Sequence, residues 1–155
     1  MVAIIFYLIV LLCLNAILII SPHLFELPAW YSHDILFANC AYMGLLGGIL
    51  YCLRAVYLNK CVSKNWDKNW ETWYYLRPIT STLSGLISSI FLKAGLLVLQ
   101  ASNLQGETPY GYYAIAFVAG YNVDNFLKKI EAIMQSAWGI KKSRSCERSE
   151  DDKCE

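Results

Sequence analysis

The sequence predicts an all-α membrane protein with four transmembrane helices, and three observations indicate this class. The chain has 155 residues, of which 57% are hydrophobic and 16% charged, and its mean hydropathy is +0.39. Soluble domains carry about 25% charged residues. Four apolar runs approach the ~20 residues that cross a bilayer, and nearly all charges lie between or after them. We therefore expect helices at about residues 2–20, 35–58, 78–100 and 109–127.

The first run, Val2 to Ile20, contains no charge and one polar residue, Asn15. It lacks the basic start and the small-residue cleavage site of a signal peptide, so we interpret it as a membrane helix. Proline disfavours helix at the residue before it, so Ser21-Pro22 is predicted to end the run. Asn15 is expected to be packing filler, with a hydrogen bond to a neighbouring helix as the alternative.

The second run, Ile35 to Leu58, has Ser32 as its predicted N-cap. Gly44, Gly47 and Gly48 expose its backbone, and small residues at such spacing let a partner helix approach closely. Arg54 lies in the last turns, where its side chain can reach the interface.

No metal site or cofactor is expected. His23 and His33 lie in a short polar loop between the first two runs, where no ligand-spacing motif links them. We interpret them as solvated loop residues, with metal binding or pH sensing as the alternative. The six cysteines contain no CxxC pair, which argues against a zinc site or a disulfide framework.

An amphipathic helix at the membrane surface is predicted between helices two and three, in residues 59–77. Trp66, Trp70, Trp73 and Tyr74 recur at the spacing of one helical face, while Lys64 and Lys68 lie mostly away from it. Such an aromatic belt favours the membrane interface. Aromatics interleaved with lysines can also stack nucleic-acid bases, but two flanking membrane helices favour anchoring, and no direct nucleic-acid binding is expected.

The third run organises the chain because its apolar and small polar residues occupy different arcs. Arg77-Pro78 is predicted to open the helix, since proline suits the first helical position. Ser81, Gly85 and Ser89 form a small-xxx-small pattern that suits helix packing or an oligomer contact. The small and hydroxylated arc is wider than one intrachain partner should cover, which predicts a homo-oligomer.

Lys93 is the one charge predicted to lie within the membrane. Counted from Ala101, it lies about 12 Å inside the helix end at ~1.5 Å per residue. A cation at that depth is costly and indicates a functional position. It could line a polar seam between subunits; a lysine that reaches the headgroups is the alternative.

The fourth run contains Gly120, with Ala116 one turn earlier, and is followed by a predicted juxtamembrane helix. Arg77 and Asp124 are expected at the same end of antiparallel neighbours, where an ion pair would fix the hairpin. The four-helix domain is predicted to span residues 1–140. Residues 141–155 form a charged tail without apolar runs, predicted to be disordered.

The charges also predict the topology. Of the 13 lysines and arginines, all but Lys93 fall on one side of a four-crossing arrangement: Arg54, Lys60, Lys64, Lys68, Arg77, Lys128, Lys129, Lys141, Lys142, Arg144, Arg148 and Lys153. The positive-inside rule then places both termini in the cytoplasm. Lys64, Lys68, Lys128, Lys129, Lys141 and Lys142 form the predicted cytoplasmic basic face, which contacts anionic lipid or a protein partner.

The stretches from Arg77 to Leu97 and from Tyr113 to Phe126 resemble a helical hairpin of small bacterial inner-membrane proteins. The likeness rests on Y-L-R-P, K-A-G-L-L and Y-A-I-A-F-V-A-G-Y-x-x-D-x-F. These families include membrane sensors or effectors of phage-defence systems of the retron or Kiwa type. The resemblance implies a hairpin that assembles into oligomers in the inner membrane and works with cytosolic partners.

Three functions follow as hypotheses. The first is an oligomeric membrane sensor or effector coupled to a cytosolic partner, for which the resemblance implies a role in phage defence. The second is an oligomeric pore that depolarises the membrane, and the remote third is an intramembrane enzyme. No Ser/His/Asp or Cys/His arrangement shares one depth and no phosphate-binding glycine loop occurs, so an enzyme is not expected.

Overall fold

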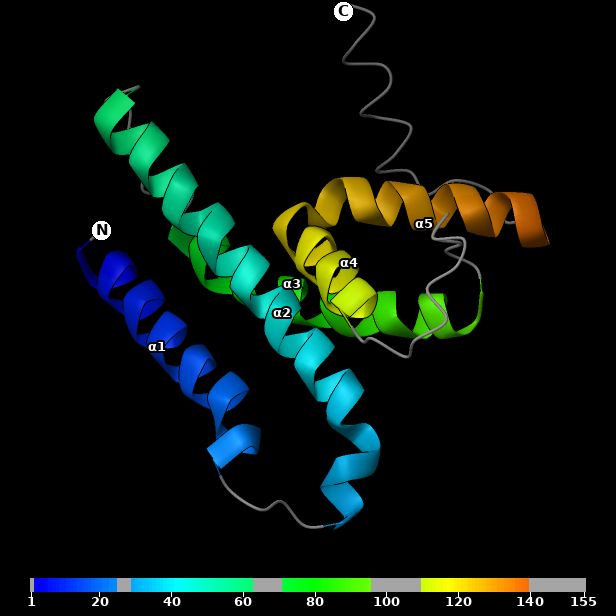
Figure 1. The fold of residues 1–155 in the computed structure, drawn as a ribbon. Coiled ribbons are helices and arrows are strands. Elements are labelled where there is room, and N and C mark those ends of the chain that lie inside the picture. The colour runs from blue at the N-terminus through cyan, green and yellow to red at the C-terminus, as the bar shows by residue number, and fades with distance from the viewer. Residues whose placement is uncertain (1, 25–28, 63–70, 96–109, 140–155) are drawn as a thin grey trace, which may run out of the picture. The chain divides into compact units, whose positions relative to one another are not determined.

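The computed structural model describes residues 2–24, 29–62, 71–95 and 110–139 (Figure 1). Within these residues the elements are α1 (Val2–Leu24), α2 (Ala29–Tyr57), the π-helical turn η1 (Leu58–Val62), α3 (Glu71–Lys93), α4 (Tyr110–Tyr121) and α5 (Val123–Trp138). The predicted all-α class is confirmed for the described residues, which contain no strand. The predicted helix at residues 59–77 lies partly outside them, with Trp66 and Trp70.

The chain divides into two compact units, Met1–Asn122 and Val123–Glu155. In the first unit α2 is central, because it packs against α1, α3 and α4, while α3 also packs against α4 (Figure 1). The helix of the second unit is α5, which ends where Gly139 adopts a φ of +66°.

The pairing of α1 with α2 is antiparallel. Ile4 and Leu8, near the start of α1, share a buried cluster with Cys52 and Val56, near the end of α2. Further along α1, the buried Asn15 donates from Nδ2 to the carbonyl oxygen of Tyr42 at 3.1 Å. The interpretation of Asn15 as filler is therefore wrong, since its amide links the two helices.

Pro22 does not end α1, which continues to Leu24. A proline has no N–H, so the carbonyl four residues earlier loses its helical donor. That carbonyl belongs to Leu18, and the hydroxyl of Ser21 donates to it at 3.1 Å. The serine next to the proline supplies the missing donor. The second helix also differs from the prediction: α2 begins at Ala29, so Ser32 lies inside it and is not its N-cap.

Both predicted ends of the third helix are wrong. It begins at Glu71, so Arg77 and Pro78 lie within α3. Glu71 in the first turn favours that start, because a carboxylate stabilises the positive end of the helix dipole. At the other end α3 stops at Lys93, and Gly95 turns the chain with a φ of +70° while its N–H bonds to the carbonyl oxygen of Leu92 at 3.0 Å.

The predicted fourth helix, residues 109–127, is divided in two by a turn at Asn122. Asparagine side chains compete with the helical backbone for hydrogen bonds, which favours an interruption there. α4 therefore has 12 residues, or about 18 Å at ~1.5 Å per residue. Residues 96–109, before Tyr110, lie outside the described part of the chain.

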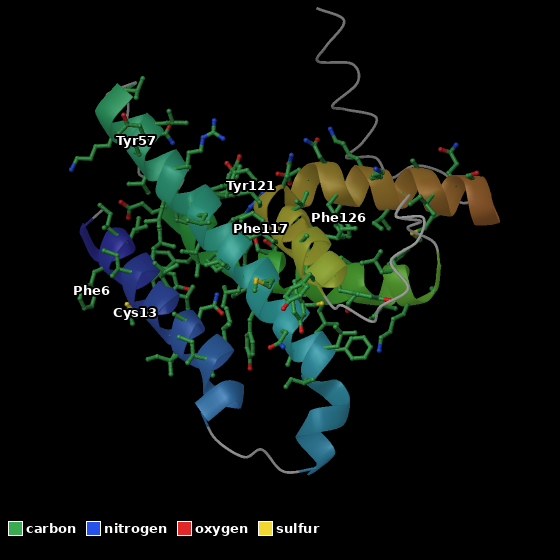
Figure 2. All side chains as sticks on the ribbon, viewed as in Figure 1. Phe6, Cys13, Tyr57, Phe117, Tyr121 and Phe126 are labelled. Carbon is green, nitrogen blue, oxygen red and sulfur yellow. The ribbon has the colours of Figure 1, made fainter. Side chains whose placement is uncertain are left out.

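The first unit exposes large apolar side chains, and α3 buries small polar ones. Phe6 of α1 is 69% exposed and Leu83 of α3 is 55% exposed, whereas Arg77 is 4% exposed. Figure 2 shows Phe6 pointing away from the neighbouring helices. In α3, the buried positions are Tyr74, Arg77, Pro78, Ser81, Ser84, Gly85, Ser88 and Ser89. This distribution is the reverse of that in a soluble helix, where the apolar face is covered.

Candidate functional site: an arginine and aromatic cluster

Three helices of the first unit meet backbone to backbone at Gly44 of α2. A Cβ atom added to Gly44 would lie 2.7 Å from Cα of Gly85 in α3 and 2.6 Å from the carbonyl oxygen of Ser81. A Cβ atom on Gly120 of α4 would overlap the backbone of Gly44 from the other side. The structure thus brings together the predicted packing residues Gly44, Gly85 and Gly120, because only glycines allow so close an approach.

The serines of α3 belong to the same contact. The side chain of Ser81 occupies the space in which Gly48 would carry a Cβ atom. Ser88 and Ser89 are buried, and their hydroxyls donate at 2.7 Å to the carbonyl oxygens of Gly85 and Leu86 in their own helix.

The small and hydroxylated arc of α3 is therefore used within the chain. It packs against α2, and α3 also contacts α4. The homo-oligomer is predicted because the arc is wider than one intrachain partner should cover. That argument does not hold, since two helices of the same chain share it. The oligomer itself stays a prediction.

Side chains from the same three helices build a second feature, which we call the arginine–aromatic cluster. Its members are Tyr51 and Arg54 of α2, Trp73, Tyr74 and Arg77 of α3, and Tyr121 of α4. The buried guanidinium of Arg77 lies over two rings: its Cζ atom is 4.7 Å from the ring centroid of Tyr51 and 5.2 Å from that of Trp73. Both distances suit cation–π attraction, which strengthens when water is excluded.

The rings of the cluster also contact one another. The ring centroid of Tyr51 lies 5.8 Å from that of Trp73 and 5.6 Å from that of Tyr121, the second pair edge to face. Trp73 meets Tyr74 edge to face at 5.2 Å. Such pairs contribute about 0.5–1.5 kcal/mol beyond the area they bury. The cluster therefore holds α2, α3 and α4 together at the end where α2 finishes and α3 begins.

Two polar side chains bind the hydroxyls at the margin of the cluster. Nη1 of the exposed Arg54 donates to the hydroxyl of Tyr121 at 2.8 Å. From the π-helical turn η1, Nδ2 of Asn59 donates to the hydroxyl of Tyr74 at 3.1 Å. π-Helical turns often occur at functional positions. A cluster of two guanidiniums and several hydroxyls is suited to recognising an anion.

Lys93 lies elsewhere, at the opposite end of α3. Because α3 ends at this residue, it does not lie two turns inside the helix as predicted. It is exposed, and its Nζ atom lies 4.1 Å from the ring centroid of Phe37. A lysine in the last turn favours the negative end of the helix dipole. The polar seam between subunits stays a prediction.

The remaining predicted residues belong to the second unit or lie outside the described residues. Asp124, Lys128 and Lys129 belong to α5 in the second unit, so the ion pair of Arg77 with Asp124 stays a prediction. Lys64, Lys68, Lys141 and Lys142 lie outside the described residues. Among the described residues, no three His, Cys, Asp or Glu side chains form a group that could hold a metal.

The cluster was not predicted from the sequence, because each of its members suits a different role there. Trp73 and Tyr74 were assigned to a membrane-surface belt, Arg54 to the interface and Arg77 to Asp124. The position of these residues along the apolar runs could have predicted the cluster. Tyr51 and Arg54 lie near the end of the second run, and Trp73 to Arg77 lie at the start of the third. Adjacent antiparallel helices bring such stretches to one level.

Comparison with protein families, curated proteins and solved structures finds no match to this chain.

Proposed function

We propose that this chain is an integral membrane protein that acts as a sensor or effector coupled to a cytosolic partner. The observation that carries the membrane location is the inverted distribution of side chains in the first unit. Two helical spans, Ala3–Ser21 and Ile35–Lys60, are long and apolar enough to cross a membrane, and only 17% and 33% of their most apolar windows are buried. The core helix of a soluble protein would be mostly covered.

The third helix supports the same location. α3 has 23 residues, or about 34 Å at ~1.5 Å per residue, which exceeds the ~30 Å hydrocarbon layer. Its exposed side chains include Leu76, Ile79, Leu83 and Ile90, while its serines face the other helices. Lipid favours that arrangement, since polar groups in a bilayer need partners within the protein. We infer that α3 is a third crossing.

The topology that we propose has four crossings in the inner membrane and both termini in the cytoplasm. α4 alone covers about 18 Å at ~1.5 Å per residue, so the fourth crossing needs residues beyond its described 12. The fourth crossing decides the side of the membrane on which the C-terminus lies, because a chain with three crossings would have its C-terminus in the periplasm.

Reporter fusions test the topology. We expect alkaline phosphatase fused after residue 155 or after residue 66 to stay inactive, because it would fold in the cytoplasm, and a fusion after residue 104 to be active. Green fluorescent protein at the same three sites serves as the reciprocal control. High phosphatase activity at residue 155 together with activity at 104 would mean three crossings and would overturn the proposed topology.

The charged residues of α5 and of the sequence after it support the coupling to a partner. The serines of α3 are used for packing, so we propose that contacts with soluble molecules fall to the segments that follow. α5 is an amphipathic helix whose charged residues include Lys128 and Lys129. The sequence after it continues with Lys141 and Lys142. Such a segment suits a membrane surface or an acidic protein surface. We propose the protein surface, and lipid is the alternative outcome.

Charge reversal distinguishes a protein partner from lipid as the ligand of this face. We expect glutamate at positions 128, 129, 141 and 142 to abolish recovery of a specific protein in pull-downs from the native host, because four attractions become repulsions. The matched control reverses Arg144, Arg148 and Lys153, which lie outside this face, and should retain it. Alkaline carbonate extraction must show that both variants remain in the membrane. Recovery of the same proteins by both variants would leave lipid as the ligand of the face.

A further inference from the structure

We propose that Arg54 and Tyr121 form a binding site for the phosphodiester of an anionic phospholipid in the cytoplasmic leaflet. The inference rests on the proposed membrane location of the first unit and names a ligand for it. Nothing in the packing role of the cluster requires an exposed, hydrogen-bonded arginine at its edge.

The first step is the geometry of Arg54. Its side chain is exposed, yet its Nη1 atom is held by the hydroxyl of Tyr121 at 2.8 Å. A guanidinium has five N–H donors in a planar fork, and the bond to Tyr121 engages one nitrogen. An arginine fixed in this way is prepared for the paired N–H···O contacts that phosphate oxygens accept.

The second step is depth. The apolar span that begins at Ile35 ends at Lys60, so Arg54 lies six residues before its end, about 9 Å at ~1.5 Å per residue. A long arginine side chain can extend from there to the phosphates. Tyr57, labelled in Figure 2, is 60% exposed one turn later, and an exposed tyrosine is typical of the headgroup level.

The third step is charge. The buried guanidinium of Arg77 shares the ring of Tyr51 with Tyr121, the partner of Arg54. Charges inside a protein are screened less than charges in water. Arg77 therefore adds to the positive potential at the edge of the cluster without itself being accessible. A phospholipid fits this site better than a soluble partner, because the surrounding side chains Tyr57, Leu58 and Val62 are apolar and exposed.

Native mass spectrometry of the full chain released from nanodiscs of phosphatidylglycerol and phosphatidylcholine tests the site. We expect the unmodified protein to retain phosphatidylglycerol about tenfold more than the Arg54→Gln variant, the loss expected for a charge-assisted hydrogen bond. Tyr121→Phe should give a smaller loss, because the arginine stays but is no longer held. Lys93→Gln is the matched control, since it removes an exposed cation from the opposite end of α3 and should not change retention.

The outcomes are distinguishable. Equal loss in Arg54→Gln and Lys93→Gln would mean nonspecific charge and would overturn the site. Inorganic phosphate that protects the protein from thermal unfolding as well as phosphatidylglycerol does would show a site for a free anion and overturn the lipid assignment. Carbonate extraction is run in parallel: an unmodified protein that is extracted disproves the membrane location itself, whereas one that resists extraction without preferring phosphatidylglycerol disproves only this inference.

Discussion

Replacing Gly44 with leucine is expected to prevent the first unit from folding. The added Cβ atom alone would lie 2.7 Å from Cα of Gly85 and 2.6 Å from the carbonyl oxygen of Ser81. These neighbours are backbone atoms of a helix, so no side-chain rotation can make room. Overpacking usually costs about 1–3 kcal/mol, and we expect the upper end of that range or more, because three helices must separate.

The measurement is unfolding of the purified protein in mixed micelles, followed by circular dichroism and by protease resistance. Ala114→Leu is the matched control, because it also introduces a leucine but at an exposed position of α4. It should change stability by less than about 0.5 kcal/mol. If Gly44→Leu unfolds no more easily than Ala114→Leu, the helices do not meet at this glycine.

Gly85→Leu extends the test to the predicted oligomer. The sequence predicted that this change disrupts contacts between subunits, whereas the structure places Gly85 against Gly44 of the same chain. We therefore expect it to unfold the protomer. A variant that remains a folded monomer while the unmodified protein is an oligomer would return Gly85 to a subunit interface.

The helices themselves were predictable because apolar runs of about 20 residues have few other structures available. Their ends were not, because these depend on single contacts. The sequence shows Pro22 but does not show that the Ser21 hydroxyl turns back to the carbonyl oxygen of Leu18. It shows Gly95 but not that this glycine adopts a φ of +70° two residues after Lys93.

The contacts between helices show a similar limit. Glycine spacing in the second run predicted close approach, yet it does not name the partner, and Gly44 has one on each side. Arg77 is predicted to form an ion pair with Asp124 because both lie at the same end of antiparallel neighbours, and that pair stays a prediction. Aromatic rings also stabilise a buried guanidinium. With 11 tyrosines and five tryptophans, the sequence does not indicate which rings contact Arg77.

Replacing Arg77 with lysine is expected to lower the free energy of unfolding by about 1–2 kcal/mol, although the charge is kept. The guanidinium is planar and lies over the rings of Tyr51 and Trp73 at 4.7 and 5.2 Å. An ammonium is a compact, strongly hydrated charge that cannot present a planar face to the rings, so burying it costs more. Lys60→Arg, the reverse exchange at an exposed position of η1, is the control and should change stability by less than about 0.5 kcal/mol.

A double-mutant cycle then isolates the contact between Arg77 and Tyr51. Arg77→Met removes the charge at similar length, and Tyr51→Leu removes the ring but keeps an apolar side chain. We expect their combined effect to be smaller than the sum of the single effects by about 1 kcal/mol, which is the coupling that one desolvated cation–π pair supplies. Additive effects would show that the ring does not stabilise the guanidinium, and the cluster would then be an apolar contact that merely surrounds an arginine.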